Sequence, residues 1–91
     1  MDFHKEKFAS LLHKLAADFF ERESNRDALV TVTKVDFDES KHKALVHISV
    51  LPKEKVKDVL PFAIRKRSDL RSFVMKNIKS RSIPSFDIVV E

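Results

Sequence analysis

Apolar residues recur at steps of three and four positions in the first part of the chain, from about Phe3 to Arg22. This spacing places them along one side of a helix, with lysines and acidic residues on the other side. The stripe comprises Phe8, Leu11, Leu12, Leu15, Ala16, Phe19 and Phe20. The pattern predicts an amphipathic helix that packs against the rest of the molecule. A polar loop is expected over Ser24–Asp27.

In the next two segments, side chains of similar kind recur at every second position, which is the pattern of β-strands. Leu29–Phe37 is rich in β-branched residues, which favour strands. His42–Leu51 is the second such segment, and the polar stretch Asp38–Lys41 lies between the two. One face of the second segment carries Ala44, Val46, Ile48 and Val50. Two strands joined by a short polar turn are expected to pair as an antiparallel hairpin.

Pro52 ends the second strand, and a helical pattern then continues to about Lys79. Its apolar positions fall into two stripes, the first with Val56, Val59, Leu60, Ala63 and Ile64, the second with Leu70, Phe73, Val74 and Ile78. Arg65–Asp69, between the stripes, contains no apolar residue. The pattern therefore predicts two helices joined by a kink near Lys66–Ser68, with Ser68 or Asp69 as the N-cap of the second helix.

Pro61 interrupts the first of these two helices, because proline lacks the backbone N–H that a helix interior needs. Two arrangements remain open. Asp58 caps a helix whose first turn contains Pro61, or the helix is bent at the proline.

Ile83–Val90 has the pattern of a last strand, with Phe86, Ile88 and Val90 on one face and Pro84 near its start. The predicted order is α-β-β-α-kink-α-β. After a helical crossover, the last strand should run in the same direction as the second. The expected fold is a two-layer α+β domain in which helices cover one face of a three-stranded sheet.

Length and composition narrow the function classes. Residues 1–91 are expected to form a single domain, and 43% hydrophobic residues suffice for one core. The absence of cysteine excludes a disulfide framework and thiolate metal sites. The absence of glycine excludes Gly-rich phosphate loops. No apolar run is long enough to cross a bilayer or resembles a signal peptide, so a cytoplasmic location is expected.

The net charge of +4 is unevenly distributed. Between Leu60 and Ser82 there are seven basic residues and one acidic residue, Asp69, whereas acidic residues outnumber basic residues in the rest of the chain. Such asymmetry is typical of proteins that bind a polyanion. The alternative is a solvated basic helix face without a partner.

Several segments of the chain form recognisable motifs. The first is Val30-Thr31-Val32-Thr33-Lys34-Val35, and the second is Ala44-Leu45-Val46-His47-Ile48-Ser49-Val50. The C-terminal part contributes Leu70-Arg71-Ser72, Lys79-Ser80-Arg81 and Ile83-Pro84-Ser85-Phe86. Together these segments resemble the ribosome-binding factor A family, in order and with compatible spacing over nearly the whole chain. Two sites depart from the family pattern: Lys66-Arg67-Ser68 replaces Ala-x-Gly at the kink, and Ser24-Asn25-Arg26 replaces Asp-Pro-Arg.

The resemblance implies a KH-like domain of the second type and a non-catalytic assembly factor. Proteins of this family bind the immature small (30S) ribosomal subunit, contact its 16S rRNA and support maturation of the 5′ end of that rRNA. They are linked to growth in the cold. The resemblance implies neither a cofactor nor a metal ion nor a small-molecule substrate.

Folded RNA hides the base edges of its major groove, so such binding depends on phosphate contacts. The predicted RNA-binding residues are Arg26, Arg65, Lys66, Arg67, Ser68, Arg71, Lys76, Lys79 and Arg81. Lys66, Arg67 and Ser68 occupy the place of the Gly-x-x-Gly loop with which ordinary KH domains clamp a backbone. The phenylalanines are interpreted as core residues rather than as platforms for bases.

Two other functions remain as alternatives. The basic helix could bind an acidic partner protein in place of RNA. Asp36, Asp38 and Glu39 could hold magnesium in a small nuclease, although carboxylates at a hairpin turn are commonly solvated turn residues. The four histidines do not have the spacing of a zinc site. One small core is enough to bury the apolar stripes found, which leaves no further apolar stripe for a dimer interface, so a monomer is expected.

Overall fold

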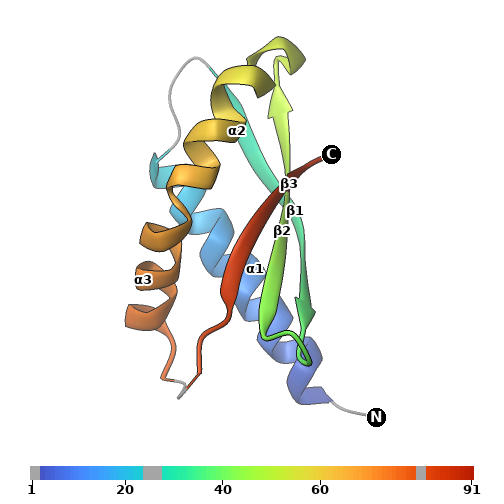
Figure 1. Cartoon of the computed structure of the whole chain (residues 1–91), viewed down its shortest axis with the longest axis vertical. Helices are drawn as coiled ribbons and strands as arrows, with labels where there is room; N and C mark the ends of the chain where they lie inside the picture. The colour runs from blue at the N-terminus through green and yellow to red at the C-terminus, as the bar shows by residue number, and fades with distance from the viewer. Residues whose placement is uncertain (1–2, 24–27, 80–81) are drawn as a thin grey trace.

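The structure is a computed structural model that describes residues 3–23, 28–79 and 82–91 (Figure 1). Its elements are α1 (Phe3–Glu23), β1 (Leu29–Asp38), β2 (Lys43–Leu51), the 3-10 helix η1 (Lys53–Lys55), α2 (Val56–Arg65), α3 (Arg67–Asn77) and β3 (Ser85–Val90). This sequence of elements confirms the predicted order. The expected loop over 24–27 lies outside the described residues.

Strand β2 is the centre of the three-stranded sheet, whose order is β1-β2-β3. It pairs antiparallel with β1, as the hairpin prediction required, and parallel with β3. Figure 1 shows how α2 and α3 form the crossover between the two parallel strands. The mixed sheet and its helices confirm the predicted α+β fold.

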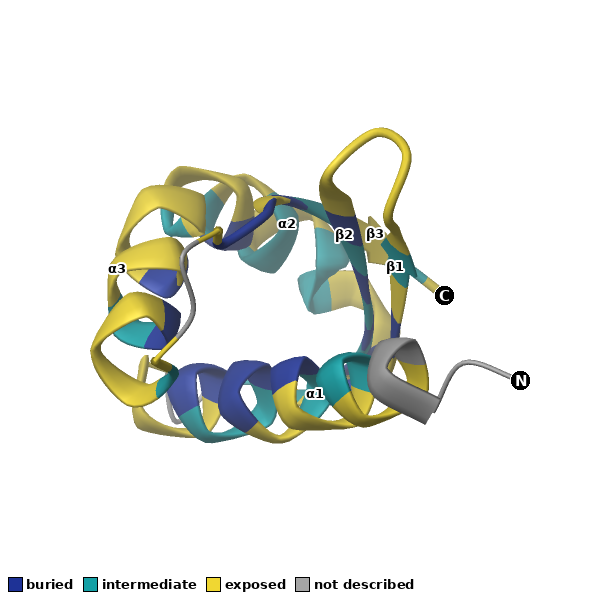
Figure 2. Ribbon diagram, turned by 90° about the horizontal axis from the view of Figure 1, so that it is seen from below, coloured by how far each residue is buried: buried dark blue, intermediate teal, exposed yellow. Residues whose placement is uncertain are grey.

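All three helices lie on one side of the sheet, and their buried residues face a common interior (Figure 2). On β2, the alternate residues Ala44, Val46, Ile48 and Val50 are buried, as predicted from the alternation. The helices contribute Leu12, Leu15, Ala16, Phe19, Phe20, Ala63, Leu70 and Val74 to the same cluster. Most residues of the predicted helical stripes therefore lie in the core or against it, but Leu11 and Ile64 are exposed, contrary to the prediction. The opposite face of the sheet is free of described helices.

A β-bulge interrupts the pairing of β1 with β2 at Thr33, between Val32 and Lys34. The carbonyl of Val32 accepts a hydrogen bond from Nε2 of His13 on α1 at 3.0 Å. The hydroxyl of Thr33 donates to the carbonyl of His47 at 3.2 Å. The bulge thus exposes a backbone acceptor that a helix side chain satisfies, which fixes α1 against the sheet.

The hairpin turn places His42 at a φ of 53°, the left-handed region that glycine usually occupies. In a chain without glycine, histidine is one of the residues that tolerate this region. Ser82 Oγ lies 2.7 Å from His42 Nε2, and the carbonyl of His42 accepts the N–H of Ser85 at 3.3 Å. The predicted strand start at His42 is wrong by one residue, because this conformation is incompatible with an extended strand.

The predicted kink lies at Lys66, but the predicted caps Ser68 and Asp69 are wrong. Helix α3 begins at Arg67, and Lys66 precedes it without a side-chain cap. The N–H of Lys66 bonds back to the carbonyls of Phe62 and Ala63, and the carbonyl of Lys66 accepts the N–H of Leu70. Lys66 therefore closes α2 with its N–H and accepts the first hydrogen bond of α3 with its carbonyl.

Helix α2 begins at Val56, so Asp58 is not its cap, and Pro61 lies inside the helix. Pro61 is exposed, as is Lys57, whose carbonyl would have bonded to the missing N–H and can bond water instead. The bond between Leu51 and Pro52 is cis.

The last strand begins two residues later than predicted, at Ser85. The N-terminal neighbours Ile83 and Pro84 are buried but do not pair with β2. Pro84 lacks the N–H that a ladder requires, and the carbonyl of Ile83 accepts a side-chain hydrogen bond from Arg71.

Candidate nucleic-acid interface

The predicted RNA-binding residues that the structure describes lie on the crossover between the two parallel strands. Arg65 ends α2, Lys66 forms the junction, Arg67, Ser68, Arg71 and Lys76 lie on α3, and Lys79 follows α3. Arg26 and Arg81 lie outside the described residues. The contacts of these side chains divide the lysines and arginines into two groups.

Lys66 is the most enclosed of these cations, with 29% of its side chain exposed. Its Nζ lies 3.7 Å from a carboxylate oxygen of Glu23 on α1 and 3.5 Å from one of Asp69 on α3. It also lies 5.6 Å from the centroid of the Phe62 ring. Lys66 therefore connects three helices at the junction, and its charge is balanced by two carboxylates.

Arg67 connects the junction to the sheet. Its Nε donates to the carbonyl of Ile64 at 3.1 Å, and its Nη1 donates to Asp87 on β3 at 2.9 Å. Asp87 also lies 3.1 Å from Nζ of Lys43 on β2. The contact between Arg67 and Asp87 therefore holds the α2–α3 crossover against β3.

Arg71 makes a second contact with the segment that enters β3. Its Nη2 donates to the carbonyl of Ile83 at 3.2 Å, and its Nη1 lies 3.5 Å from Sδ of Met75. Arginine carries five N–H donors, so Arg71 keeps donors for a phosphate while it holds Ile83. We call Lys66, Arg67 and Arg71 the anchored cations.

Arg65, Lys76 and Lys79 form the second group, the unpaired cations. All three side chains are exposed, and none has an ion pair or hydrogen bond with another described residue. No carboxylate of a described residue lies within ion-pair distance of their charged groups, so these cations can meet a polyanion without breaking an existing ion pair. Ser68, also exposed, lies between the two groups in sequence.

Lys43 and Arg67 hold the pKa of Asp87 below its ordinary value of 3.8, with the hydrogen bond from Lys43 as the largest cause. The ionised carboxylate therefore stabilises the fold above that ordinary value, and the contribution is lost as the pH falls through the lowered pKa. Since Asp87 is about one-third exposed, solvent screening limits the effect.

Asp87→Asn is expected to lower the free energy of unfolding at neutral pH by about 0.5 kcal/mol. The variant should also lose less stability than the wild type as the pH falls below about 4. Urea unfolding over a series of pH values measures both effects. Asp58→Asn, on the exposed surface of α2, controls for the loss of one carboxylate, and identical pH profiles for Asp87→Asn and wild type would contradict the expectation.

A groove between α1 and α3 contains residues that the sequence interpretation did not select. It is lined by Phe19, Arg22, Glu23, Asp69, Ser72, Phe73 and Lys76, and we call it the α1–α3 groove. The guanidinium carbon of Arg22 lies 5.3 Å from the centroid of the Phe73 ring. The sequence placed Arg22 at a helix end without a function, and its signal, an arginine in the last turn of α1, is common to many helices.

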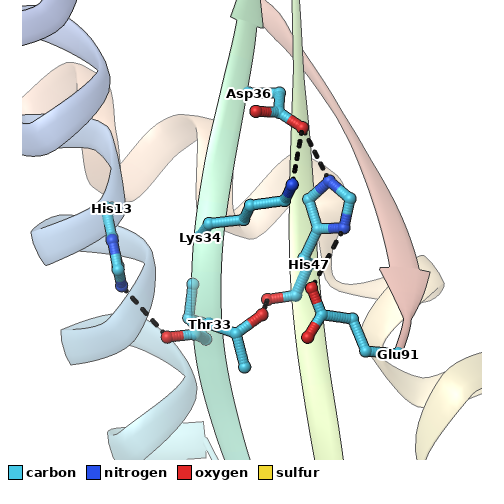
Figure 3. Close-up of polar contacts among 7 residues, drawn as sticks. His13, Thr33, Lys34, Asp36, His47 and Glu91 are labelled. Carbon is cyan, nitrogen blue, oxygen red and sulfur yellow. Dashed lines mark hydrogen bonds and ion pairs between the residues drawn. The ribbon is translucent and has the colours of Figure 1, made fainter.

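Asp36, one of the three acidic residues near the hairpin turn, lies on β1 and contacts side chains of β1 and β2 (Figure 3). Asp36 lies 2.9 Å from Nε2 of His47 and 3.8 Å from Nζ of Lys34, and Glu91 lies 3.5 Å from Nδ1 of His47. No group of three histidine or acidic side chains that could hold a metal ion occurs in the described part of the chain.

Asp38 accepts hydrogen bonds from the hydroxyl of Ser40 at 2.7 Å and from the backbone N–H of Lys41 at 3.2 Å. These contacts, with Ser40 as the larger cause, lower the pKa of Asp38. Asp38 therefore has the contacts of a turn-forming aspartate.

The phenylalanines interpreted as core residues are buried or partly buried against the core. Phe19, Phe20 and Phe86 are buried, and Phe8 and Phe73 pack against the cluster. No helix among residues 3–23, 28–79 and 82–91 combines the length and the apolar character needed to cross a membrane.

No protein-family model matches the sequence, and no curated protein matches it at a significant level. Solved structures that are similar to the chain include the following two. The crystal structure of ribosome-binding factor A from Thermus thermophilus has a TM-score of 0.82 and 16% identity, and the match covers 94% of this chain and 93% of that chain. The solution structure of a proposed ribosome-binding factor A from Thermotoga maritima has a TM-score of 0.77 and 24% identity, covering 96% and 86%. The chain thus has the fold of ribosome-binding factor A.

Proposed function

We propose that the chain binds the immature small (30S) ribosomal subunit, contacts its 16S rRNA and assists maturation of the 5′ end of that rRNA. The observation that carries the proposal is the concentration of exposed lysines and arginines on the α2–α3 crossover of a ribosome-binding factor A fold. On this proposal the chain acts in the cytoplasm as a monomer of one domain. It performs no catalysis and needs no cofactor.

The proposed binding depends on the phosphates of folded rRNA, because an A-form helix exposes its backbone rather than its major-groove base edges. The unpaired cations Arg65, Lys76 and Lys79 supply charge without disrupting contacts inside the protein. Each phosphate that they neutralise releases counterions, so the affinity should fall steeply as salt is added.

The anchored cations have a second role in this proposal. Lys66, Arg67 and Arg71 hold the junction against α1 and β3, so the unpaired cations are presented from a fixed surface. A surface ordered before binding loses less side-chain entropy when it meets the RNA.

Sedimentation with purified ribosomal particles tests the choice of partner. The wild-type chain is expected to pellet with small subunits, and not with large subunits, at moderate salt, and raising the salt should release it. Free 16S rRNA serves as the comparison for RNA outside the particle. Equal pelleting with every RNA, or none with small subunits, would contradict the proposal.

The alternative partner, an acidic protein, would give a different result in a pull-down with the tagged chain. After ribonuclease digestion of the particles, the chain should capture no ribosomal protein if the rRNA is the ligand. Binding that survives ribonuclease, in a fixed ratio to one ribosomal protein, would favour the protein-interaction function instead.

A further inference from the structure

The phosphate contacts proposed above give no role to the α1–α3 groove. We infer that this groove binds one unpaired nucleotide of the RNA, with its base against the guanidinium of Arg22 and its phosphate at Lys76. The inference rests on the proposed function and specifies an element of the RNA that the chain recognises. It also predicts that the chain binds RNA with an unpaired base next to an RNA helix more tightly than fully paired RNA.

Arg22 has the position of a stacking platform. Its guanidinium lies over the ring of Phe73, and the ring centroid of Phe19 lies 5.7 Å from that of Phe73. Phe19 is buried in the core, so Phe73 packs against a fixed neighbour. Arg22 is an exposed residue, so a ligand in the groove can reach its side chain. Guanidinium planes, like aromatic rings, stack on unpaired bases.

The charges of the groove suit a nucleotide better than an acidic peptide. Glu23 and Asp69 line it, and both pair with Lys66, while Arg22 and Lys76 add two further positive charges. Lys66 lies beside the groove rather than in its lining, and its ion pairs with Glu23 and Asp69 offset part of their negative charge, which leaves Arg22 and Lys76 available to a phosphate. The carboxylates would repel an acidic peptide, whereas they can accept hydrogen bonds from the N–H groups of a base edge.

The dimensions also fit a single nucleotide. The groove has a volume of about 300 Å³, at the small end of the range for ligand sites. It is continuous with the proposed phosphate surface, because Lys76 belongs to both. One RNA strand can therefore contact Lys79 and Lys76 through its backbone and turn a base toward Arg22.

Fluorescence anisotropy with two probes tests the inference. One probe is a labelled single-stranded RNA of about 12 nucleotides, and the other is a duplex of the same sequence. Arg22→Ala is expected to weaken single-strand binding by roughly 10-fold, the value of one lost stacking contact. Duplex binding should change by about 2-fold, through the loss of one charge.

Two variants separate stacking from charge. Arg22→Lys keeps the charge and loses the planar group, so it should show most of the single-strand defect of Arg22→Ala. Lys7→Ala removes one charge from the other end of α1 and should leave the ratio of single-strand to duplex affinity unchanged. Both arginine variants should unfold at the wild-type temperature, because Arg22 is exposed.

Three outcomes would overturn the inference. Arg22→Ala could weaken binding of both probes equally, Arg22→Lys could bind the single strand with wild-type affinity, or polyglutamate could displace the single strand as readily as RNA does. Failure here is distinct from failure of the proposed function. If the chain sediments with small subunits but the Arg22 variants bind RNA normally, the proposed function stands and the groove inference is wrong. If the chain binds the single strand through Arg22 but does not sediment with small subunits, the groove inference stands and the proposed partner is wrong.

Discussion

Replacing Arg65, Lys76 and Lys79 together by alanine is expected to weaken binding to small ribosomal subunits on the order of 100-fold near 0.1 M salt. These side chains are exposed and have no partner among the described residues, so their removal changes the charge of the surface and not its packing. Each lost phosphate contact should also reduce the slope of log affinity against log salt by about 1. Titration of labelled protein with small subunits at several salt concentrations gives both quantities.

The matched control removes the same charge elsewhere. Lys7, Lys14 and Lys41 are also exposed, on α1 and in the hairpin turn, and their replacement by alanine gives a chain with the same net charge. This control should lose little affinity if the crossover is the binding surface. If the control and the crossover variant lose the same affinity, binding depends on net charge alone and the proposed interface is wrong.

Leu70→Ala is expected to lower the free energy of unfolding by about 3 kcal/mol. Leu70 is fully buried in α3 and is one of the largest fully buried side chains. Its truncation leaves a cavity among core residues that can relax only partly. Loss of that size is a large fraction of the total stability of a small domain. Urea unfolding followed by circular dichroism measures it.

Met75→Ala is the control for Leu70→Ala, since Met75 lies on the same helix with 52% exposure. It should cost less than about 0.5 kcal/mol, as most exposed substitutions do. Similar losses for the two variants would mean that α3 is not packed on the core as the structure has it.

The order of the elements could be predicted from the sequence because each one has a clear period. The alternation in β2 and the helical stripe of α1 both reappear as buried faces. The predicted cap at Ser68 was wrong because α3 begins at Arg67, and the carbonyl of Lys66 accepts the first hydrogen bond of that helix, from the N–H of Leu70. The sequence pattern did not show at which residue of the polar stretch the second helix begins.

The position of the basic residues on the crossover could also be predicted, because it follows from their place in the sequence and from the order of the elements. The residues that they contact within the protein could not be predicted. Arg67 and Asp87 are twenty positions apart, and only the parallel packing of β3 beside the crossover brings them together. The same holds for Arg22 and Phe73, which approach each other because α1 packs against α3. Whether the basic residues contact RNA stays a prediction.

The parallel pairing of β2 with β3 has a consequence for the order of folding. The hairpin of β1 and β2 closes over a short loop, whereas β3 can pair only after a crossover of roughly thirty residues has been organised. The cations lie on that crossover, and Arg67 and Arg71 hold it to β3 and the segment before it. The basic surface is thus complete only in the fully folded chain. An RNA that binds this surface binds only the folded chain, and it therefore shifts the folding equilibrium toward the folded state by mass action.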